Sequence, residues 1–187
     1  MKAARTLFAR KGMEECTIRD IARKAGVSPA SVVVHFKSKT ALLEEALCGD
    51  IESALSELAA SMPEDLELLD RLMHLSKGFL KLYDKNRELY RALIRSTVFE
   101  PESETPIMSK LSERYIQFLS RIIEEQKGQG IVRPQVASRI AAASIFSLYM
   151  GALITMFRMP EMTVDMVSDI LGSMTEQYLK GITRTHR

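Results

Sequence analysis

The sequence predicts an all-α protein, and three of its properties support this fold class. Glycine (9) and proline (6) are scarce among the 187 residues, so long segments lack helix breakers. Most apolar residues recur at helical spacing. Apolar residues make up 46% of the chain and charged residues 27%, a balance typical of a soluble globular protein rather than a disordered one.

The first thirty residues carry a dense series of helix start and stop signals. A first helix is expected from the N-terminus to about Lys11, with Gly12 as its stop. Thr17 precedes the segment IRDIARKA and has Asp20 three residues later, which is a variant of the capping box that begins a helix. Gly26 stands where the left-handed residue that ends this second helix is needed.

A third helix is expected directly afterwards, in the segment PASVVVHF. Ser28 is its N-cap and Pro29 its first residue. Valine favours strands, but a β-branched residue costs only roughly 0.5 kcal/mol in a helix relative to alanine. Burial of Val32 and Phe36 against the first two helices outweighs this cost, because each side chain contributes about 1.5–3 kcal/mol. Two short helices joined by a glycine-containing turn form a helix-turn-helix.

The rest of the chain is expected to form long helices. A linking helix is expected from Lys39 to about Ala60, and Gly49 inside it is a bend or a close-packing point, with an ordinary helix position as the alternative. Further helices are expected over residues 65–83, 87–98, 107–129, 135–157 and 164–180. The predicted domains are a helix-turn-helix head at residues 1–46 and an all-helical body at residues 47–187.

Residues 140–157 carry no charge and approach the minimum length of a membrane span. Small and hydroxyl-bearing residues such as Ser144, Ser147 and Gly151 favour a helix packed between other helices, and a membrane span is the alternative. The first residues lack the apolar run of a secretory signal. Cys16 and Cys48 form no spaced framework, so a cytoplasmic protein with reduced thiols is expected, with a redox-sensing pair as the alternative.

Charge is distributed unevenly along the chain. Residues 1–40 hold nine Lys/Arg and three Asp/Glu, a net charge of +6, whereas the remaining residues hold 17 and 21, a net charge of −4. A basic head on an acidic body indicates an anionic partner, most commonly nucleic acid. With the helix-turn-helix, this predicts a protein that binds double-stranded DNA.

So small a motif reads little sequence alone, so a homodimer on a palindromic site is expected, with recognition helices about 34–36 Å or somewhat more apart. The dimer surface is predicted on the last two long helices, which would pair as a four-helix bundle. The final helix carries an apolar stripe of Val164, Val167, Ile170, Leu171, Met174, Tyr178 and Leu179. Burial of this stripe within one subunit is the alternative.

The sequence contains little that indicates an enzyme. Its histidines are His35, His74 and His186, and no metal-ligand spacing, glycine-rich phosphate loop or nucleophile–base pattern accompanies them. No catalytic residue, cofactor or metal is therefore predicted.

The segment LFARKGMEECTIRDIARKAGVSPASVVVHFKSKTALLEEAL resembles the DNA-binding head of the tetracycline-repressor (TetR) family of bacterial transcription regulators. The resemblance covers about residues 1–47 and rests on Leu7-Phe8, Lys11-Gly12, Thr17 to Ala22, Gly26-Val27-Ser28, His35-Phe36, Ser38-Lys39 and Leu42-Leu43. The body is similar to the family only in pattern, through GIVRP, an Ala-rich helix and a final amphipathic helix.

The resemblance implies which residues contact DNA: Thr17, Arg19, Ser28, Pro29, Ala30, Ser31, Val33, His35 and Lys39. Two features depart from the family pattern. Val33 stands where the family usually has tyrosine, so a phosphate-binding hydroxyl is missing. The chain also starts inside the first helix, without the basic arm of many relatives. Shape readout and contacts to thymine methyl groups are therefore expected to contribute to specificity.

The resemblance also implies a regulator, most often a repressor, that a small apolar or amphipathic effector releases from its operator. The predicted effector pocket comprises Met73, His74, Phe79, Tyr83, Leu93, Tyr115 and Phe118, in which His74, Tyr83 and Tyr115 are the polar residues that could orient a ligand. Eleven methionines suit an adaptable apolar cavity. The alternative function is a helical protein-interaction module that keeps the head fold without sequence-specific DNA binding.

Overall fold

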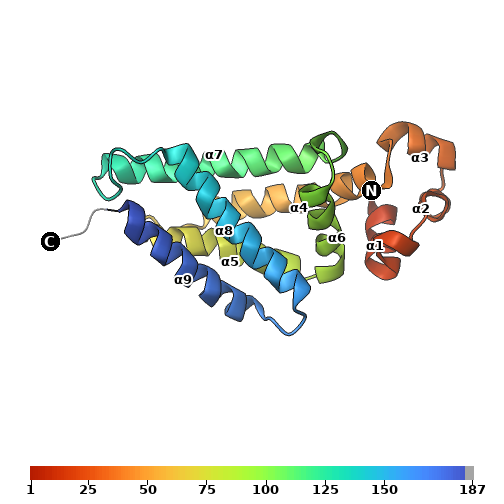
Figure 1. The fold of residues 1–187 in the computed structure, drawn as a ribbon. Coiled ribbons are helices and arrows are strands. Elements are labelled where there is room, and N and C mark those ends of the chain that lie inside the picture. Colours follow the sequence, from red (N-terminus) through yellow and green to blue (C-terminus); the bar gives the residue numbers. More distant parts are fainter. Residues whose placement is uncertain (184–187) are drawn as a thin grey trace. The chain divides into compact units, whose positions relative to one another are not determined.

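The computed structural model describes residues 1–183, and this part of the chain forms nine α-helices and no β-strand (Figure 1). The prediction of an all-α fold with a helix-turn-helix head is confirmed. The helices are α1 (Lys2–Glu15), α2 (Ile18–Ala25), α3 (Pro29–Phe36), α4 (Lys39–Ala60), α5 (Leu68–Asp84), α6 (Arg87–Phe99), α7 (Pro106–Gly128), α8 (Ser138–Arg158) and α9 (Val164–Ile182), with a 3₁₀ turn at Glu102–Glu104. His186 lies outside the described residues.

The chain divides into two compact units. The head unit comprises Met1–Ala54 and Leu82–Leu111, and the body unit comprises Leu55–Lys81 and Ser112–Arg187. Helices α4, α5 and α7 each contribute residues to both units. The three head helices therefore share one unit with α6 and the first turns of α4 and α7.

Helix α1 contains a kink where the sequence predicts a stop. Gly12 has φ 77° and ψ 167°, a conformation outside the helical range that glycine adopts without steric cost, and the helix then continues to Glu15. Three residues before this kink are buried: Ala4, Leu7 and Phe8. Helix α1 packs against α2 and α6.

A polar contact holds α1, α4 and α6 together inside the head unit. Arg5 Nη1 donates a hydrogen bond to Asp50 Oδ1 at 3.0 Å, and the other guanidinium nitrogen contacts Oδ2 of the same carboxylate. Tyr90 Oη also donates to Asp50 Oδ2, at 3.3 Å. Two-point pairing of a guanidinium with a carboxylate fixes geometry better than a single contact does.

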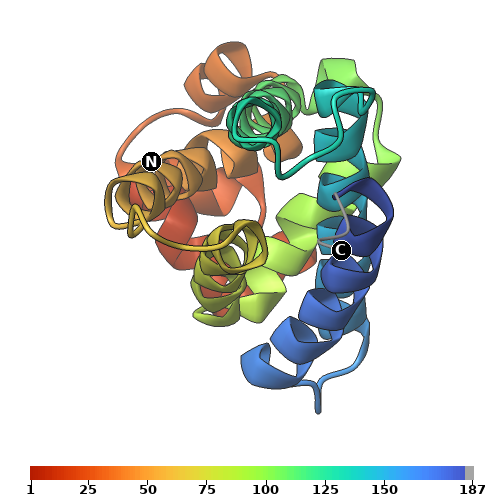
Figure 2. The ribbon, with the colours of Figure 1, turned by 90° about the vertical axis from the view of Figure 1, so that its left-hand side faces the viewer.

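In the body unit, α8 and α9 lie side by side (Figures 1 and 2). Helix α8 buries nine residues: Ser138, Ala141, Ala142, Ile145, Tyr149, Ala152, Leu153, Met156 and Phe157. It begins three residues later than expected because residues 133–136 form a turn, in which the Val136 amide donates to the Arg133 carbonyl at 3.1 Å. Helix α5 also begins later than expected, at Leu68, after a turn at residues 64–65.

Helix α8 is the one helix among residues 1–183 that is long and apolar enough to cross a membrane. A core helix of a soluble protein can have this length and apolar composition, so the two properties alone are weak evidence of a membrane span. Its nine buried residues and its packing against α9 favour the interpretation as a packed helix.

Candidate nucleic-acid interface

The start of α2 is fixed by the predicted capping box. Thr17 Oγ1 accepts a hydrogen bond from the Asp20 amide at 3.1 Å, and the Thr17 amide donates to Asp20 Oδ2 at 3.4 Å. The Asp20 carboxylate also pairs with Lys11 at 3.1 Å and with Arg23 at 2.7 Å. Hydrogen bonds from Lys11 and then Thr17 lower the pKa of Asp20. The negative charge of Asp20, in the first turn of α2, is thus paired with Lys11 and Arg23 on the same surface.

The turn between α2 and α3 has the predicted left-handed glycine. Gly26 has φ 70° and ψ 29°, and its amide donates to the Arg23 carbonyl at 3.3 Å. The Val27 amide donates to the Ala22 carbonyl at 3.0 Å. These bonds satisfy carbonyls that a helix leaves unpaired at its end, so α2 stops within one residue and the chain turns.

Helix α3 begins directly after this turn, as predicted. Ser28 Oγ accepts a hydrogen bond from the Ser31 amide at 3.0 Å and lies 2.8 Å from Ser31 Oγ, while Pro29 occupies the first helical position. The helix ends at Phe36, and its C-cap residue Lys37 has φ 59°, an uncommon conformation for a residue other than glycine. The three consecutive valines are therefore helical.

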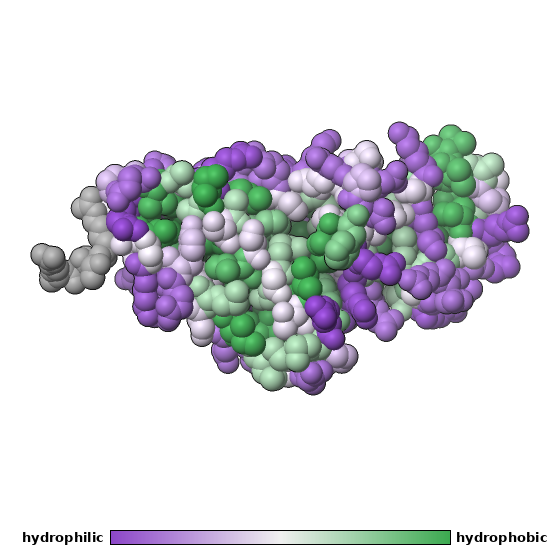
Figure 3. Space-filling model, in the orientation of Figure 1, coloured by the Kyte–Doolittle hydropathy of each residue, from purple (hydrophilic) through white to green (hydrophobic). Residues whose placement is uncertain are grey.

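The valines of α3 point in different directions. Val32 is buried, whereas Val33 is 52% exposed and Val34 is 83% exposed. Figure 3 shows hydrophobic surface at α3, next to hydrophilic surface of the same unit. Phe36, predicted to be buried, is only half-buried, and the exposed His35 ring meets it edge-on at 4.6 Å between centroids. Two apolar side chains thus face outward from the basic head.

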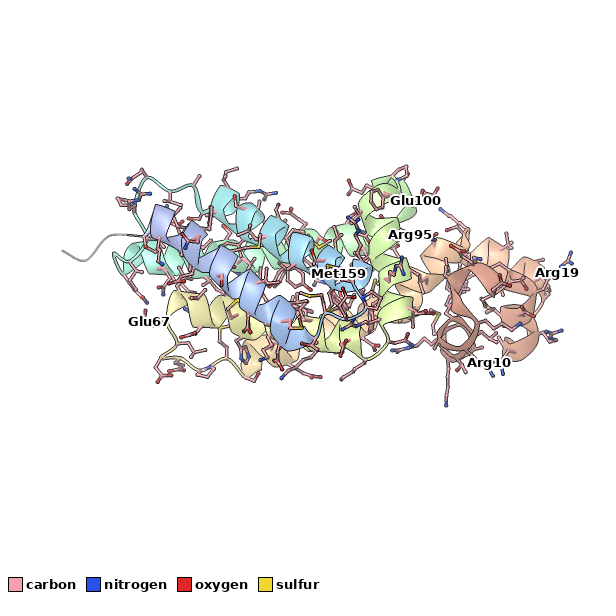
Figure 4. The ribbon with its side chains drawn as sticks, turned by 60° about the horizontal axis from the view of Figure 1, so that its bottom comes forward. Arg10, Arg19, Glu67, Arg95, Glu100 and Met159 are labelled. Carbon is pink, nitrogen blue, oxygen red and sulfur yellow. The ribbon has the colours of Figure 1, made fainter. Side chains whose placement is uncertain are left out.

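The predicted DNA-contacting residues lie on the surface of α2, α3 and the start of α4. Eight are exposed: Thr17, Arg19, Ser28, Pro29, Ala30, Ser31, Val33 and His35. Arg19 points outward from the end of the head in Figure 4. Lys39 is half-buried, and its Nζ donates a hydrogen bond to the Glu14 carbonyl at 3.3 Å. A phosphate contact from Lys39 would have to share or replace this bond.

Val34 is an outward-facing residue that the predicted site omits. It lies four residues after Ala30 and three after Ser31, so all three share one face of α3. This helical spacing was the signal that could have placed it in the site. The Val34 side chain is suited to contact the methyl group of thymine in a major groove.

Residues 1–46 match the family model described as bacterial regulatory proteins, tetR family. The head thus carries the DNA-binding domain of the TetR family. It is 32% identical over 117 residues to the nucleoid occlusion factor SlmA of Haemophilus influenzae (strain PittGG), an alignment that covers 62% of this chain and spans half of that relative's length.

Two further similarities extend over more of the chain. It is 26% identical over 141 residues to the HTH-type transcriptional repressor KstR2 of Rhodococcus jostii, covering 74% of the chain and 68% of that protein. Its fold matches the crystal structure of Thermus thermophilus FadR, a TetR-family transcriptional repressor in complex with lauroyl-CoA, with a TM-score of 0.82 and 17% identity. That match covers 100% of this chain and 94% of FadR.

The predicted effector residues fall into both units. Tyr83 and Leu93 belong to the head unit, where the Tyr83 and Tyr90 rings lie 5.0 Å apart. Met73, His74, Phe79, Tyr115 and Phe118 belong to the body unit. His74 Nε2 lies 3.1 Å from the Leu58 carbonyl oxygen and 3.3 Å from Ser61 Oγ, so this imidazole ties α5 to the end of α4.

Tyr115 lies at the centre of an aromatic cluster in the body unit. Its ring is 5.4 Å from Phe79, 6.0 Å from Phe146 and 6.4 Å from Tyr149. Sequence reasoning did not select Phe146 and Tyr149, because both lie on α8, which was assigned to the dimer surface. Phe118 lies outside this cluster, beneath the Arg121 guanidinium at 5.7 Å from its ring centre.

The apolar stripe predicted on α9 divides between two faces. Val167, Leu171 and Leu179 are buried within the unit, whereas Ile170 and Met174 are exposed. On α8, Ile140 is 66% exposed. Figure 3 shows hydrophobic surface over α8 and α9 on the face turned to the viewer. Burial within one subunit therefore holds for Val167, Leu171 and Leu179, whereas the dimer surface stays a prediction for the exposed residues.

Neither cysteine thiol is placed for redox chemistry. Cys16 and Cys48 are both buried and free. Burial raises the pKa of Cys48 to about 12 and also raises the pKa of Cys16, so both remain protonated near neutral pH.

Among the described residues, no three His, Cys, Asp or Glu side chains gather so that they could hold a metal ion.

Proposed function

We propose that this chain is a cytoplasmic, homodimeric transcriptional regulator, most simply a repressor, that binds a palindromic DNA operator and leaves it when a small apolar or amphipathic effector binds the body unit. The observation that carries the proposal is the outward face of α3. Exposed hydroxyl and methyl groups on a capped helix, in a segment of net charge +6, match the chemistry of a major groove edge and its flanking phosphates.

We assign phosphate contacts to Thr17, His35 and Lys39, and contacts in the groove to Arg19 and the exposed residues of α3. Pro29, Ala30 and Val33 offer few hydrogen bonds, so methyl contacts and DNA shape would provide much of the specificity. With roughly three to five phosphate contacts per subunit, the log–log slope of affinity against salt is expected to be about −5 to −9 for the dimer.

The exposed faces of α8 and α9 support dimerisation. Small side chains at Ser144, Ser147 and Gly151 lie on one face of α8, which would let a partner helix approach closely. The exposed Ile170 and Met174 of α9 would supply apolar contact area. Pairing α8 and α9 with the same helices of a second copy gives a four-helix bundle.

The interior of the body unit supports an apolar or amphipathic effector. Its buried polar residues within the described part are Ser76, Gln126, Ser138, Ser168 and Thr175, with no acidic or basic side chain among them. A ligand that carries a net charge would need a buried counter-ion or an exposed charged end. The aromatic cluster around Tyr115 is the proposed contact surface for the apolar part.

A binding experiment tests the DNA part of this proposal. Duplexes selected from a random-sequence library by the full chain should contain a palindrome, and their affinity should fall steeply with salt. Arg19→Ala and Lys39→Glu should each weaken binding by about tenfold, the effect of roughly 1.4 kcal/mol. Lys85→Glu is the matched control, since Lys85 is an exposed lysine in the loop between α5 and α6.

Failure to select any duplex, or binding without salt dependence, would overturn the proposal in favour of a helical interaction module. The effector part is tested by adding lauroyl-CoA, with free CoA as control, to the DNA complex. A coupling free energy of 1–3 kcal/mol predicts an affinity loss of about 5–150-fold for an effector that fits. Phe146→Ala should reduce that loss, because it opens the aromatic cluster without changing a head residue.

A further inference from the structure

Glu44 on α4 is a fully buried acidic residue, with 0% of its surface exposed. The proposed DNA binding gives it no role. Its Oε1 accepts a hydrogen bond from the Met108 amide at 2.9 Å, across 64 residues of sequence. Burial raises the pKa of Glu44, and hydrogen bonds from the Met108 and Ile107 amides oppose that change. The contact joins α4 to the first turn of α7 inside the head unit.

Met108 is the third residue of α7, and its amide is one that an N-cap side chain ordinarily satisfies. Thr105 occupies the N-cap position, because its carbonyl accepts the Ser109 amide at 3.1 Å. Threonine is a favoured N-cap residue, yet its hydroxyl, in a residue only 1% exposed, has no hydrogen-bond partner within the described chain. A residue from α4 therefore caps α7 in place of the local one.

The Glu44 cap is incomplete. Its second oxygen, Oε2, is buried and has no hydrogen-bond partner among residues 1–183. A buried carboxylate whose acceptor sites are partly unfilled is unfavourable, and so is a buried hydroxyl without a partner. Rotation of the Thr105 side chain onto the Met108 amide would keep α7 capped and would let Glu44 leave.

We propose that the first turn of α7 has two interchangeable caps, Glu44 and Thr105, and that their exchange couples α4 to α7. Helix α4 begins at Lys39, directly after the recognition helix, and α7 carries Tyr115 further along. With Glu44 as the cap, α4 is bonded to α7; with Thr105 as the cap, α4 is released while α7 stays intact. The effect of this exchange on DNA affinity rests on the proposed function, whereas the existence of the two caps does not.

Hydrogen exchange at the Met108 amide tests for the two caps, using NMR on protein labelled with ¹⁵N-methionine and Met108→Leu for assignment. Glu44→Leu and Thr105→Val should each change Met108 protection by less than about threefold, because the other cap remains. The double variant should lose at least tenfold, and Glu44→Leu combined with Thr105→Ser, which keeps a hydroxyl, should stay protected.

An equal loss in Glu44→Leu and in the double variant would overturn the proposal, as would a double variant that stays protected. If Glu44→Leu does not fold, the same cycle is measured with Glu44→Gln, whose neutral amide is a weaker acceptor than a carboxylate. The double variant should then lose at least threefold more protection than the two single changes together, and additive losses would overturn the proposal.

DNA affinity, measured by fluorescence anisotropy on a selected duplex, tests the coupling. Thr105→Val keeps the Glu44 cap, so it should bind DNA as tightly as the wild type or more tightly. Glu44→Leu leaves only the Thr105 cap and should bind at least fivefold more weakly. Changes in the same direction would overturn the coupling. If the wild type binds no DNA while the exchange cycle is non-additive, the proposed function fails and the two caps stand.

Discussion

Helices α3 and α8 are held in place in opposite ways. Helix α3 buries only Val32 and has Ser28 as an N-cap directly after the Gly26 turn. Helix α8 buries nine residues, and its N-cap residue, Ala137, makes no side-chain hydrogen bond. Local backbone chemistry thus positions the recognition helix and leaves its side chains outside for a partner, whereas packing positions α8.

The exposed apolar surfaces of α3 and α9 differ in the size of their side chains and in the charge around them. Val33 and Val34 are short, stiff side chains in a segment of net charge +6. Ile170 and Met174 are longer side chains on α9, in the part of the chain with net charge −4. Short methyl-bearing side chains among cations suit a DNA groove, while larger apolar side chains without that charge suit a second protein surface.

The largest expected effect comes from charging the α9 surface. Ile170→Glu should give a monomer by analytical ultracentrifugation and reduce operator affinity by about 100-fold or more. The reason is that a monomer binds DNA with one head and makes half of the phosphate contacts that the dimer makes. Its Tm should stay close to that of the wild type if the dimer adds little to the stability of each subunit. Ala60→Glu, at an exposed position of α4, makes the same charge change and should remain dimeric. A dimeric Ile170→Glu variant would remove α9 from the interface.

Packing in the body unit predicts the next largest effect. A Cβ at Gly78 would lie 2.3 Å from Leu58 Cδ2 and 2.9 Å from Cγ, so Gly78→Ala should lower the free energy of unfolding by about 1–3 kcal/mol. A Cβ at Gly49 meets nothing within 4 Å, and Gly49→Ala should instead stabilise α4 by roughly 0.5–1 kcal/mol. Urea titration of both variants decides whether Gly78 is a close-packing site; equal effects would contradict it.

Removing a local cap should affect the head more than the body. Ser28→Ala should cost about 1 kcal/mol and speed amide exchange along the whole of α3, which has eight residues and one buried side chain. Thr163 caps α9, because its Oγ1 accepts a hydrogen bond from the Met166 amide at 3.2 Å. Thr163→Ala should speed amide exchange only in the first turn of α9. If both helices lost protection over their full length, the contrast between head and body would be wrong.

The smallest change in stability is expected at Val34. Val34→Ala removes an exposed side chain, so the free energy of unfolding should change by less than about 0.5 kcal/mol, whereas Val32→Ala in the core should cost about 1–3 kcal/mol. Val34→Ala should nevertheless weaken binding to duplexes with thymine under α3. Replacing that thymine by uracil, which lacks the methyl group, should abolish the difference between the variant and the wild type. A difference that persists would argue against a methyl contact.

Much of the head was predictable because its signals are local. The Thr17–Asp20 box, the left-handed Gly26 and the Ser28 cap each act over at most four residues, so the sequence order determines their geometry. The exposed positions of α3 follow from helical periodicity once its start is known. Val34 lies on the same exposed face, and its contact with DNA stays a proposal.

The effector region was less predictable because its contacts come from distant segments. Phe146 and Tyr149 join Tyr115 through packing of α8 against α7, which periodicity does not reveal. Periodicity also marked one apolar stripe on α9, but the neighbouring helices decide which residues of the stripe are covered. The involvement of His74 with the Leu58 carbonyl could not be anticipated either.

Sequence alone determined the helices, the turn between α2 and α3 and the basic character of the head, because each depends on neighbours in the chain or on simple composition. Tertiary structure decided that Glu44 rather than Thr105 caps α7, and which apolar side chains remain outside. A hydrogen bond between residues 64 positions apart leaves no periodic trace, since its geometry depends on the path of the whole chain between them.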